Sequence, residues 1–153
     1  MKIRGMFFAS TLAVGLLGAA VVSAQEPSAV PNPVRAEDPA ANEAIAFADP
    51  LFQGPAMRLK VGDELSDLRK TAAGNWAERI SSLKVGSDAI VVLYSWFNFG
   101  HVCLGLPGTG SGGSGRFADL SRIKSKDLPI GFDNNSRSLR VVAKGTNLRK
   151  ICH

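Results

Sequence analysis

Short apolar runs broken by turn residues fill the chain from Ala44 onward. These runs are rich in β-branched, aliphatic and aromatic residues, which is typical of strands. Gly, Pro, Asn and Asp recur between them at fairly even spacing, a pattern that predicts an all-β sandwich. The six main predicted strands are Ile45–Ala48, Met57–Lys60, Ser81–Val85, Ile90–Tyr94, Val102–Leu106 and Ser138–Ala143.

Two weaker segments, Glu64–Leu68 and Arg116–Asp119, are expected to form edge strands. Helix is expected only as a turn or two within Thr71–Glu78 or Ser121–Asp127. Alternating apolar positions should meet between two packed sheets. The residues expected in this core are Ile80, Leu83, Val85, Val91, Leu93, Leu139 and Val141.

The N-terminus has the pattern of an export signal. A positively charged start precedes an uncharged apolar stretch, and Val22-Ser23-Ala24 then provides small residues for cleavage. The stretch is too short and too poorly flanked to predict a membrane span, although an uncleaved anchor is the alternative. Residues 1–24 are therefore predicted to be a signal peptide. The mature protein is predicted to be secreted, or held in the periplasm or cell wall, with no transmembrane segment.

Four prolines among Ala, Glu and Asp mark residues 25–43 as a mobile linker without apolar periodicity. The whole chain has 18 basic and 13 acidic residues, and cleavage of the signal removes two of the basic ones. The remaining excess lies in residues 101–153, which favours anionic partners. These basic residues are scattered and have no interleaved aromatics, so nucleic acid is not a predicted partner. A solvated face is the simpler interpretation.

Four segments repeat in order and carry a resemblance to a known family. Phe47–Gly54 has the spacing aromatic, four residues, aromatic, one residue, glycine, and Trp76–Val85 follows it; Tyr94–His101 and Phe132–Val141 form a second copy. Together they resemble the two motifs of a βγ-crystallin domain. The resemblance covers residues 45–143. It implies a Greek-key β-sandwich of two four-stranded motifs.

The resemblance also implies the internal organisation of a domain over residues 44–153. Motif one would span 45–86, motif two 89–144, and a C-terminal tail 145–153. Trp76 and Phe132 would fill equivalent corners. One position departs from the pattern, because His101 stands where the family has glycine; we expect strain or a slightly different hairpin there.

Many members of this family bind two calcium ions through a stretch of Asn/Asp, Asn/Asp, two variable residues, Ser/Thr and Ser. The matching stretches are Ala77–Ser82 and Asp133–Ser138. In the family, the acidic pair of one motif faces the hydroxyl of the other. The implied sites are therefore Asp133 and Asn134 with Ser81, and a degenerate one in which Ala77 and Glu78 face Arg137.

Oxygen donors suit calcium, whereas an arginine repels it. The expectation is therefore at most one weakly bound calcium ion, with no cofactor required. At the degenerate site, we expect the Arg137 guanidinium to pair with the Glu78 carboxylate in place of an ion.

Cys103 and Cys152 are the only cysteines, and in an exported protein they are predicted to form a disulfide. The alternative is a zinc site with His101 and His153, whose spacing matches no common pattern. Gly108–Gly115 contains a glycine pattern but lacks the strand and helix of a dinucleotide site, so it is interpreted as a flexible connection. The two histidines lie near the cysteines rather than beside an activating carboxylate, and neither Ser81 nor Ser138 has an evident base nearby. The protein is therefore not predicted to be an enzyme.

The resulting functional hypothesis is a secreted, non-catalytic binding protein, in its sharper form an inhibitor of an extracellular protease. The candidate interface is Trp96, Phe97 and Asn98, with the glycine-rich loop as a second exposed loop. Trp96 is either a packing plug or an interface anchor, and packing is the preferred interpretation. The partner would be an extracellular protein or an anionic surface. Two alternatives are a basic toxin or antimicrobial acting on membranes or cell walls, and a calcium-assisted structural or stress protein.

Overall fold

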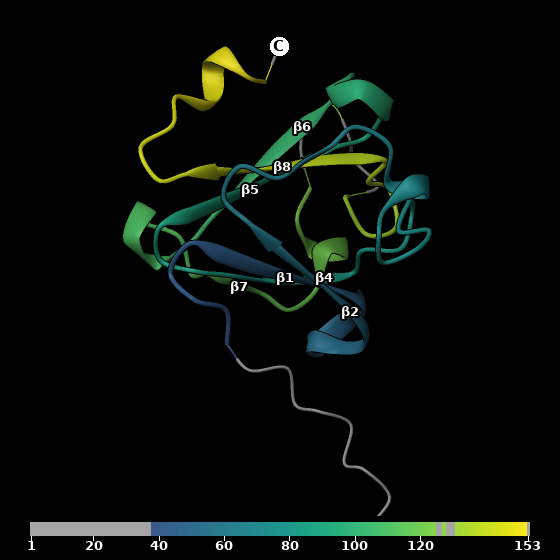
Figure 1. Cartoon of the computed structure of the whole chain (residues 1–153), viewed down its shortest axis with the longest axis horizontal. Coiled ribbons are helices and arrows are strands. Elements are labelled where there is room, and N and C mark those ends of the chain that lie inside the picture. The colour runs from purple at the N-terminus through teal and green to yellow at the C-terminus, as the bar shows by residue number, and fades with distance from the viewer. Residues whose placement is uncertain (1–37, 125–126, 128–130, 153) are drawn as a thin grey trace, which may run out of the picture. The chain divides into compact units, whose positions relative to one another are not determined.

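The computed structural model describes residues 38–124, 127 and 131–152, so the predicted signal peptide lies outside the described residues. The described chain contains two four-stranded antiparallel sheets, drawn one above the other in Figure 1. The strands are β1 (Glu43–Asp49), β2 (Gln53–Lys60), β3 (Glu64–Leu65), β4 (Ser82–Val85), β5 (Ala89–Tyr94), β6 (Cys103–Pro107), β7 (Arg116–Phe117) and β8 (Ser138–Ala143). All six main predicted strands and both edge strands are present.

The two sheets exchange one strand each. One sheet has the order β2-β1-β4-β7 and the other has the order β3-β8-β5-β6. The first four strands belong to motif one and the last four to motif two, so β3 and β7 each pair in the sheet of the other motif. The same order of first, second and fourth strands occurs in both sheets. This arrangement confirms the all-β Greek-key sandwich and gives the domain an internal pseudo-twofold relation.

The core lies between the sheets and matches the apolar alternation of the strands. All seven residues expected in the core are buried and belong to one hydrophobic cluster. Trp76 and Phe132 are buried in the same cluster. Burial of such side chains is the main favourable contribution to folding, at roughly 1.5–3 kcal/mol for each large apolar side chain.

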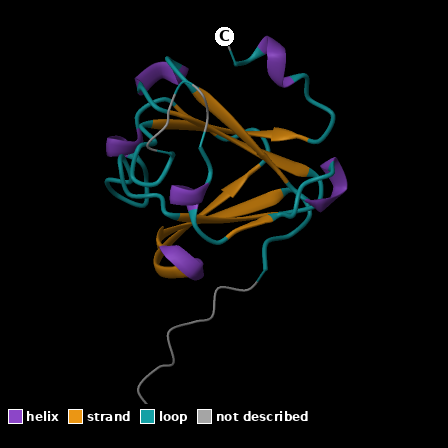
Figure 2. Cartoon of the chain, turned by 180° about the vertical axis from the view of Figure 1, so that it is seen from behind, coloured by secondary structure: helices purple, strands orange, loops and turns teal. Residues whose placement is uncertain are grey.

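In the described residues, five 3₁₀ turns connect the strands and a sixth lies in the C-terminal tail; Figure 2 shows them as short purple segments around the orange strands. They are η1 (Pro50–Phe52), η2 (Leu68–Lys70), η3 (Phe97–Phe99), η4 (Thr109–Ser111), η5 (Leu120–Arg122) and η6 (Leu148–Lys150). The helix expected within Thr71–Glu78 is wrong. Thr71 and Gly74 form a β-bridge there, and Glu78 has a positive φ of 58°. The helix expected within Ser121–Asp127 is reduced to the turn η5.

The glycine-rich segment Gly108–Gly115 is a packed loop, which corrects its interpretation as a flexible connection. A Cβ at Gly108 would meet the carbonyl oxygen of Gly86, and a Cβ at Gly110 would meet that of Ser87. Gly108 also donates its backbone N–H to the Ala89 carbonyl over 3.0 Å. The glycines are therefore needed because two backbone segments approach closely.

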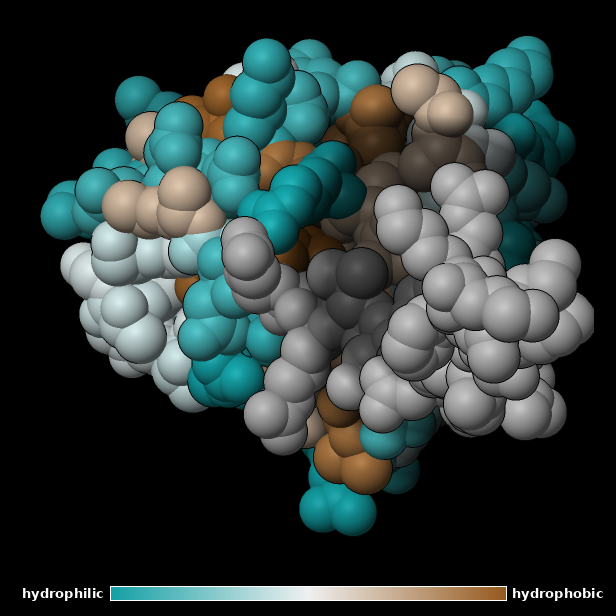
Figure 3. Space-filling model, turned by 60° about the horizontal axis from the view of Figure 1, so that its bottom comes forward, coloured by the Kyte–Doolittle hydropathy of each residue, from teal (hydrophilic) through white to brown (hydrophobic). Residues whose placement is uncertain are grey.

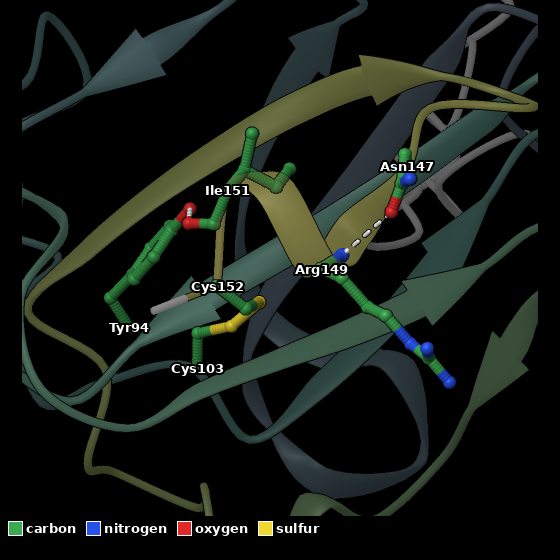
Figure 4. The surroundings of a disulfide bond; sticks show 6 residues. All are labelled: Tyr94, Cys103, Asn147, Arg149, Ile151 and Cys152. Carbon is green, nitrogen blue, oxygen red and sulfur yellow. Dashed lines mark hydrogen bonds between the residues drawn. A yellow bond between two sulfur atoms is a disulfide. The ribbon is translucent and has the colours of Figure 1, made fainter.

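The C-terminal tail is fixed across the second sheet (Figure 1). Cys103 and Cys152 form the predicted disulfide, with their Cα atoms 5.7 Å apart. Figure 4 shows it beside Tyr94, whose hydroxyl donates to the Ile151 carbonyl over 3.0 Å. The tail residues Leu148 and Ile151 pack against a second apolar cluster that contains Ile90, Val92 and Tyr94. The tail thus covers the apolar outer face of β5, which would otherwise be exposed to solvent.

The surface of the described domain is mixed in character. The face turned forward in Figure 3 shows hydrophobic patches interrupted by hydrophilic residues. Leu51 and Trp96 are the large apolar side chains that stand out as exposed in the described part of the chain. Among the described residues, no helix has the length and apolar character of a membrane span.

Candidate functional sites

Each motif begins with a folded hairpin that has the same backbone conformation. Positive φ occurs at three equivalent positions, namely Leu51, Phe52 and Gly54 in motif one and Asn98, Phe99 and His101 in motif two. Aromatic pairs brace both hairpins: the ring centroids are 5.9 Å apart for Phe47 and Phe52 and 5.5 Å apart for Tyr94 and Phe99. His101 therefore keeps the hairpin of the pattern and adopts the left-handed conformation that a glycine would take more easily.

A buried serine closes each hairpin. Ser82 donates its hydroxyl to the Asp49 carbonyl over 2.6 Å and accepts the Phe52 N–H over 3.0 Å. Ser138 makes the equivalent bonds to Trp96 and Phe99, again over 2.6 and 3.0 Å. The last serine of each ligand-like stretch is thus fully engaged in holding a hairpin. The preceding position, Ser81 or Arg137, is the one left to face a ligand.

The calcium corner (Ser81, Asp133 and Asn134) brings together oxygen donors from both motifs. The Ser81 hydroxyl donates to Asn134 Oδ1 over 3.4 Å, and the Asn134 N–H donates to the Ile80 carbonyl over 3.2 Å. Asp133 Oδ1 is buried and has no hydrogen-bond partner among the described residues. A buried carboxylate oxygen without a partner is costly, and a hard cation would satisfy it. These three side chains therefore fit calcium chemically.

The equivalent place in the other half of the domain has a different chemistry. Arg137 donates from Nε and Nη2 to Glu78 Oε1 over 2.8 and 2.6 Å, so the predicted contact between these side chains is present. Glu78 N–H donates to the Ser136 carbonyl over 2.9 Å, which mirrors the bond between Asn134 and Ile80. The loop geometry is preserved, but Ala77 offers no side-chain ligand and Arg137 brings a positive charge. A calcium ion does not fit here.

Aromatic side chains surround this arginine. The Arg137 guanidinium carbon lies 4.4 Å from the Trp96 ring centroid and 5.7 Å from that of Phe97. A second arginine, Arg69, lies 4.1 Å from the Phe97 centroid and is held by Asp67 through two side-chain bonds of 2.9 and 2.8 Å. Arg69 lowers the pKa of Asp67 to about 2, chiefly through these hydrogen bonds. We call Arg69, Trp96, Phe97 and Arg137 the arginine–aromatic corner.

The structure corrects the preferred interpretation of Trp96. This residue is 54% exposed, so its side chain does not fill the core. Phe97 is half-buried and Asn98 is exposed, while the Asn98 N–H donates to the Ser66 carbonyl over 2.8 Å. The three predicted interface residues thus lie on a braced hairpin. Their geometry suits an anchor of fixed conformation better than a packing element.

Other candidate chemistry is limited in the part of the chain that the structure describes. No cluster of three His, Cys, Asp or Glu side chains suited to a metal occurs there. The disulfide removes both thiolates from the zinc alternative, and His153 lies outside the described residues. His101 Nδ1 is 3.1 Å from the Ser95 hydroxyl, a pair that the sequence did not suggest. For this exposed pair, no carboxylate is hydrogen-bonded to the imidazole within the described residues.

Arg69, a member of the arginine–aromatic corner, was not predicted from the sequence. Arg69 follows a predicted edge strand, about thirty residues before Phe97, and nothing in the local pattern distinguishes it from other surface arginines. The strand exchange between the motifs brings η2 next to the second hairpin, as the bond from Asn98 to Ser66 illustrates. Only this tertiary pairing identifies the residue.

Comparison with solved structures identifies the architecture. A domain studied for the evolution of the eye-lens βγ-crystallin fold superposes with a TM-score of 0.54 at 20% identity, covering 69% of this chain and 90% of that one. The chain has the fold of a βγ-crystallin domain. A βγ-crystallin domain from Flavobacterium johnsoniae gives a TM-score of 0.52 at 22% identity, covering 68% and 98%.

A third βγ-crystallin domain comes from the Abundant Perithecial Protein of Neurospora crassa, whose structure is in the Ca²⁺-bound form. It gives a TM-score of 0.52 at 19% identity, covering 73% of this chain and all of that one. No family model and no curated protein matches the sequence. At these identities the likeness concerns the βγ-crystallin fold, and the function must be argued from the side chains of this chain.

Proposed function

We propose that this protein is a secreted, non-catalytic binding module. In this proposal the calcium corner holds one weakly bound ion, and the arginine–aromatic corner contacts an extracellular protein. The observation that carries the proposal is the asymmetry between two places that the fold makes equivalent. One retains oxygen donors with an unsatisfied carboxylate, and the other has an arginine beside two neighbouring aromatic rings.

Calcium binding is supported by the donors and by their surroundings. The Neurospora domain was solved with Ca²⁺ bound, which makes this fold compatible with the ion. In this chain Asp133 would supply the charge, and Asn134 and Ser81 would supply neutral oxygens. A site with a single carboxylate should be weak, at dissociation constants of roughly 10⁻⁴–10⁻³ M, as in extracellular modules.

Binding of a protein partner is supported by the composition and rigidity of the arginine–aromatic corner. Tryptophan and arginine are enriched among the residues that dominate binding energy in protein interfaces. Here Trp96 lies on a closed hairpin, and Glu78 and Asp67 orient Arg137 and Arg69 beside it. Side chains that are already fixed lose little conformational entropy on binding.

An anionic membrane or cell wall is a less well supported partner. Five basic residues of the C-terminal half are in ion pairs within the domain: Arg116, Arg122, Arg137, Arg140 and Lys144. Each acidic partner reduces the local positive potential that would attract a phosphate surface. The C-terminal half therefore presents no concentrated positive surface among these five residues, which favours contact with a protein over binding to an anionic surface.

The binding proposal is tested with Trp96→Ala and a matched control, Leu51→Ala. Leu51 is 65% exposed and lies on the equivalent hairpin of motif one. The assay is inhibition of a panel of secreted proteases, with direct binding measured for any protease that responds. Trp96→Ala should weaken binding by about 2 kcal/mol or more, and Leu51→Ala should leave it within about 0.5 kcal/mol. Equal effects of the two variants would contradict a role for this corner. If none of the proteases is inhibited, the proposal that the protein is a protease inhibitor is contradicted.

A further inference from the structure

Two equivalent cross-strand residue pairs, one in each sheet, differ in charge. In the second sheet, Glu64 of β3 lies opposite Arg140 of β8, so an acid faces a base. In the first sheet the equivalent strands β7 and β4 place Arg116 opposite Lys84, so two bases face each other. Like charges directly opposite one another destabilise a sheet. The pair formed by Lys84 and Arg116 therefore needs a neighbouring anion, and neither β4 nor β7 contains an acidic residue.

Lys84 lies in surroundings that make this requirement stronger. Its side chain is 10% exposed, although a lysine ammonium is seldom buried without compensation. Nζ lies 5.5 Å from the Phe52 ring centroid, and the Arg116 guanidinium carbon lies 5.3 Å from the same centroid. Two cations thus converge on one aromatic ring beside the first hairpin.

The anion comes from the segment before the first strand. Asp38 Oδ1 is 2.9 Å from Lys84 Nζ and 2.9 Å from Arg116 Nη1. Hydrogen bonds from Lys84 and then Arg116 lower the pKa of this carboxyl, so it is charged at neutral pH. Asp38 itself is 66% exposed and belongs to the stretch predicted as a linker. Figure 1 shows the described end of this stretch, residues 38–42, beside the sheet that contains β4 and β7.

A pocket of about 330 Å³ lies beside the contact, and Asp38 is one of its lining residues. Its lining includes Lys84 and Arg116, together with Ser87 and Thr109 from the packed loops. Backbone from the glycine-rich loop, including Gly115, completes the wall. The pocket therefore combines two cations with hydroxyl and backbone groups, which is a suitable environment for a carboxylate carried on a polar molecule.

We propose that this pocket is a carboxylate-binding site and that Asp38 is its built-in occupant. A ligand carboxylate binds between Lys84 Nζ and Arg116 and displaces Asp38, which releases the segment before the first strand from the sheet. Asp38 competes at a high effective concentration because it is tethered a few residues from β1. The site then responds only to a ligand that also uses the pocket wall, and this carboxylate site is separate from both corners described above.

The test removes the internal competitor. Asp38→Ala and the unsubstituted mature protein are titrated at low ionic strength with N-acetyl-aspartate and, separately, with glucuronate, which represent an acidic protein and an acidic glycan. Backbone and side-chain NMR signals of Lys84, Arg116 and Thr109 report binding. We expect saturable shifts in Asp38→Ala with at least one probe, at an affinity roughly tenfold higher than in the unsubstituted protein. The tighter probe identifies the source of the carboxylate.

Two further variants make the result specific. Asp38→Ala/Arg116→Gln should lose the shifts because one of the two cations is gone. Glu64→Ala removes the acid from the equivalent pair with Arg140 in the second sheet and should gain no affinity. The proposal is overturned if neither probe binds Asp38→Ala, if the unsubstituted protein binds equally well, or if the double variant retains the shifts. Unchanged NMR spectra outside the pocket verify the fold of each variant.

Discussion

His101 and Gly54 occupy equivalent positions and adopt φ values of 63° and 74°. The left-handed conformation costs an ordinary residue roughly 1–2 kcal/mol, whereas glycine accepts it freely. His101 recovers part of this cost through its contact with Ser95. The sequence located the departure from the pattern, but it could not decide between strain and a changed hairpin, because that outcome depends on how firmly Ser138 and the aromatic pair hold the loop.

His101→Gly should therefore stabilise the domain. Relief of the backbone strain outweighs the lost exposed hydrogen bond and the added freedom of the unfolded chain, for a net gain of about 0.5–1 kcal/mol. Urea denaturation at equilibrium measures the change. Gly54→Ala is the opposite control, because its Cβ would meet the Asp49 carboxylate, and it should destabilise the domain. A loss of stability in His101→Gly would show that the hairpin is not strained.

The ligand-like stretches were also predicted at the level of single residues. Their positions, Ala77–Ser82 and Asp133–Ser138, follow from the spacing of the motifs. The contact of Arg137 with Glu78 was expected because, in the family, the stretch of one motif faces the stretch of the other. The orphaned Asp133 oxygen and the stacking of Arg69 on Phe97 did not follow. Both depend on side-chain directions that are set by tertiary packing rather than by local pattern.

Among the elements, the strands were predictable and their connections were less so. Alternating or β-branched runs fix the strands because each must bury one face. The packed glycine-rich loop and the contact of Asp38 with β4 and β7 were missed, because a glycine- or proline-rich composition suggests mobility whether or not another segment packs against it. The tail was placed correctly because the predicted disulfide constrains it.

The disulfide should contribute strongly to stability. It joins residues separated by 49 positions and holds the tail over Ile90 and Val92. The double variant Cys103→Ala/Cys152→Ala should lose about 2–4 kcal/mol of unfolding free energy, mainly through the freer unfolded chain. Guanidinium denaturation gives the value, and increased binding of a hydrophobic dye would report exposure of the outer sheet face. Unchanged stability would mean that packing alone holds the tail.

Tyr94 provides a pH-dependent probe of the same element. Burial raises its pKa, with Arg140 opposing part of the shift, and it is the only tyrosine in the chain. A raised pKa in the folded state means that the associated stability is complete below pH 10, the usual pKa, and is lost as the pH rises through the folded-state value. Tyrosinate absorbance should therefore titrate above pH 10 in the folded protein and at lower pH in the cysteine double variant. Identical titrations would contradict burial by the tail.

The whole molecule combines a symmetric scaffold with asymmetric chemistry. Both hairpins, both serine clasps and both ligand-like loops repeat in the two motifs. The side chains that would contact a ligand differ at equivalent places of the two motifs. Ser81 in motif one is equivalent to Arg137 in motif two, and Glu64 in motif one is equivalent to Arg116 in motif two. Fold-level likeness explains the scaffold, while these few positions distinguish the chain from a module with two equal cation sites.

Calorimetric titration of the metal-free protein with calcium tests this asymmetry most directly. We predict one weak site per chain, lost in Ser81→Ala and retained in Ser82→Ala, which should lower only stability because it removes a hairpin clasp. Arg137→Ala should not change the affinity of that site. Two sites of similar affinity, or a single site that survives Ser81→Ala and disappears in Arg137→Ala, would contradict the assignment of calcium to one corner and of partner binding to the other.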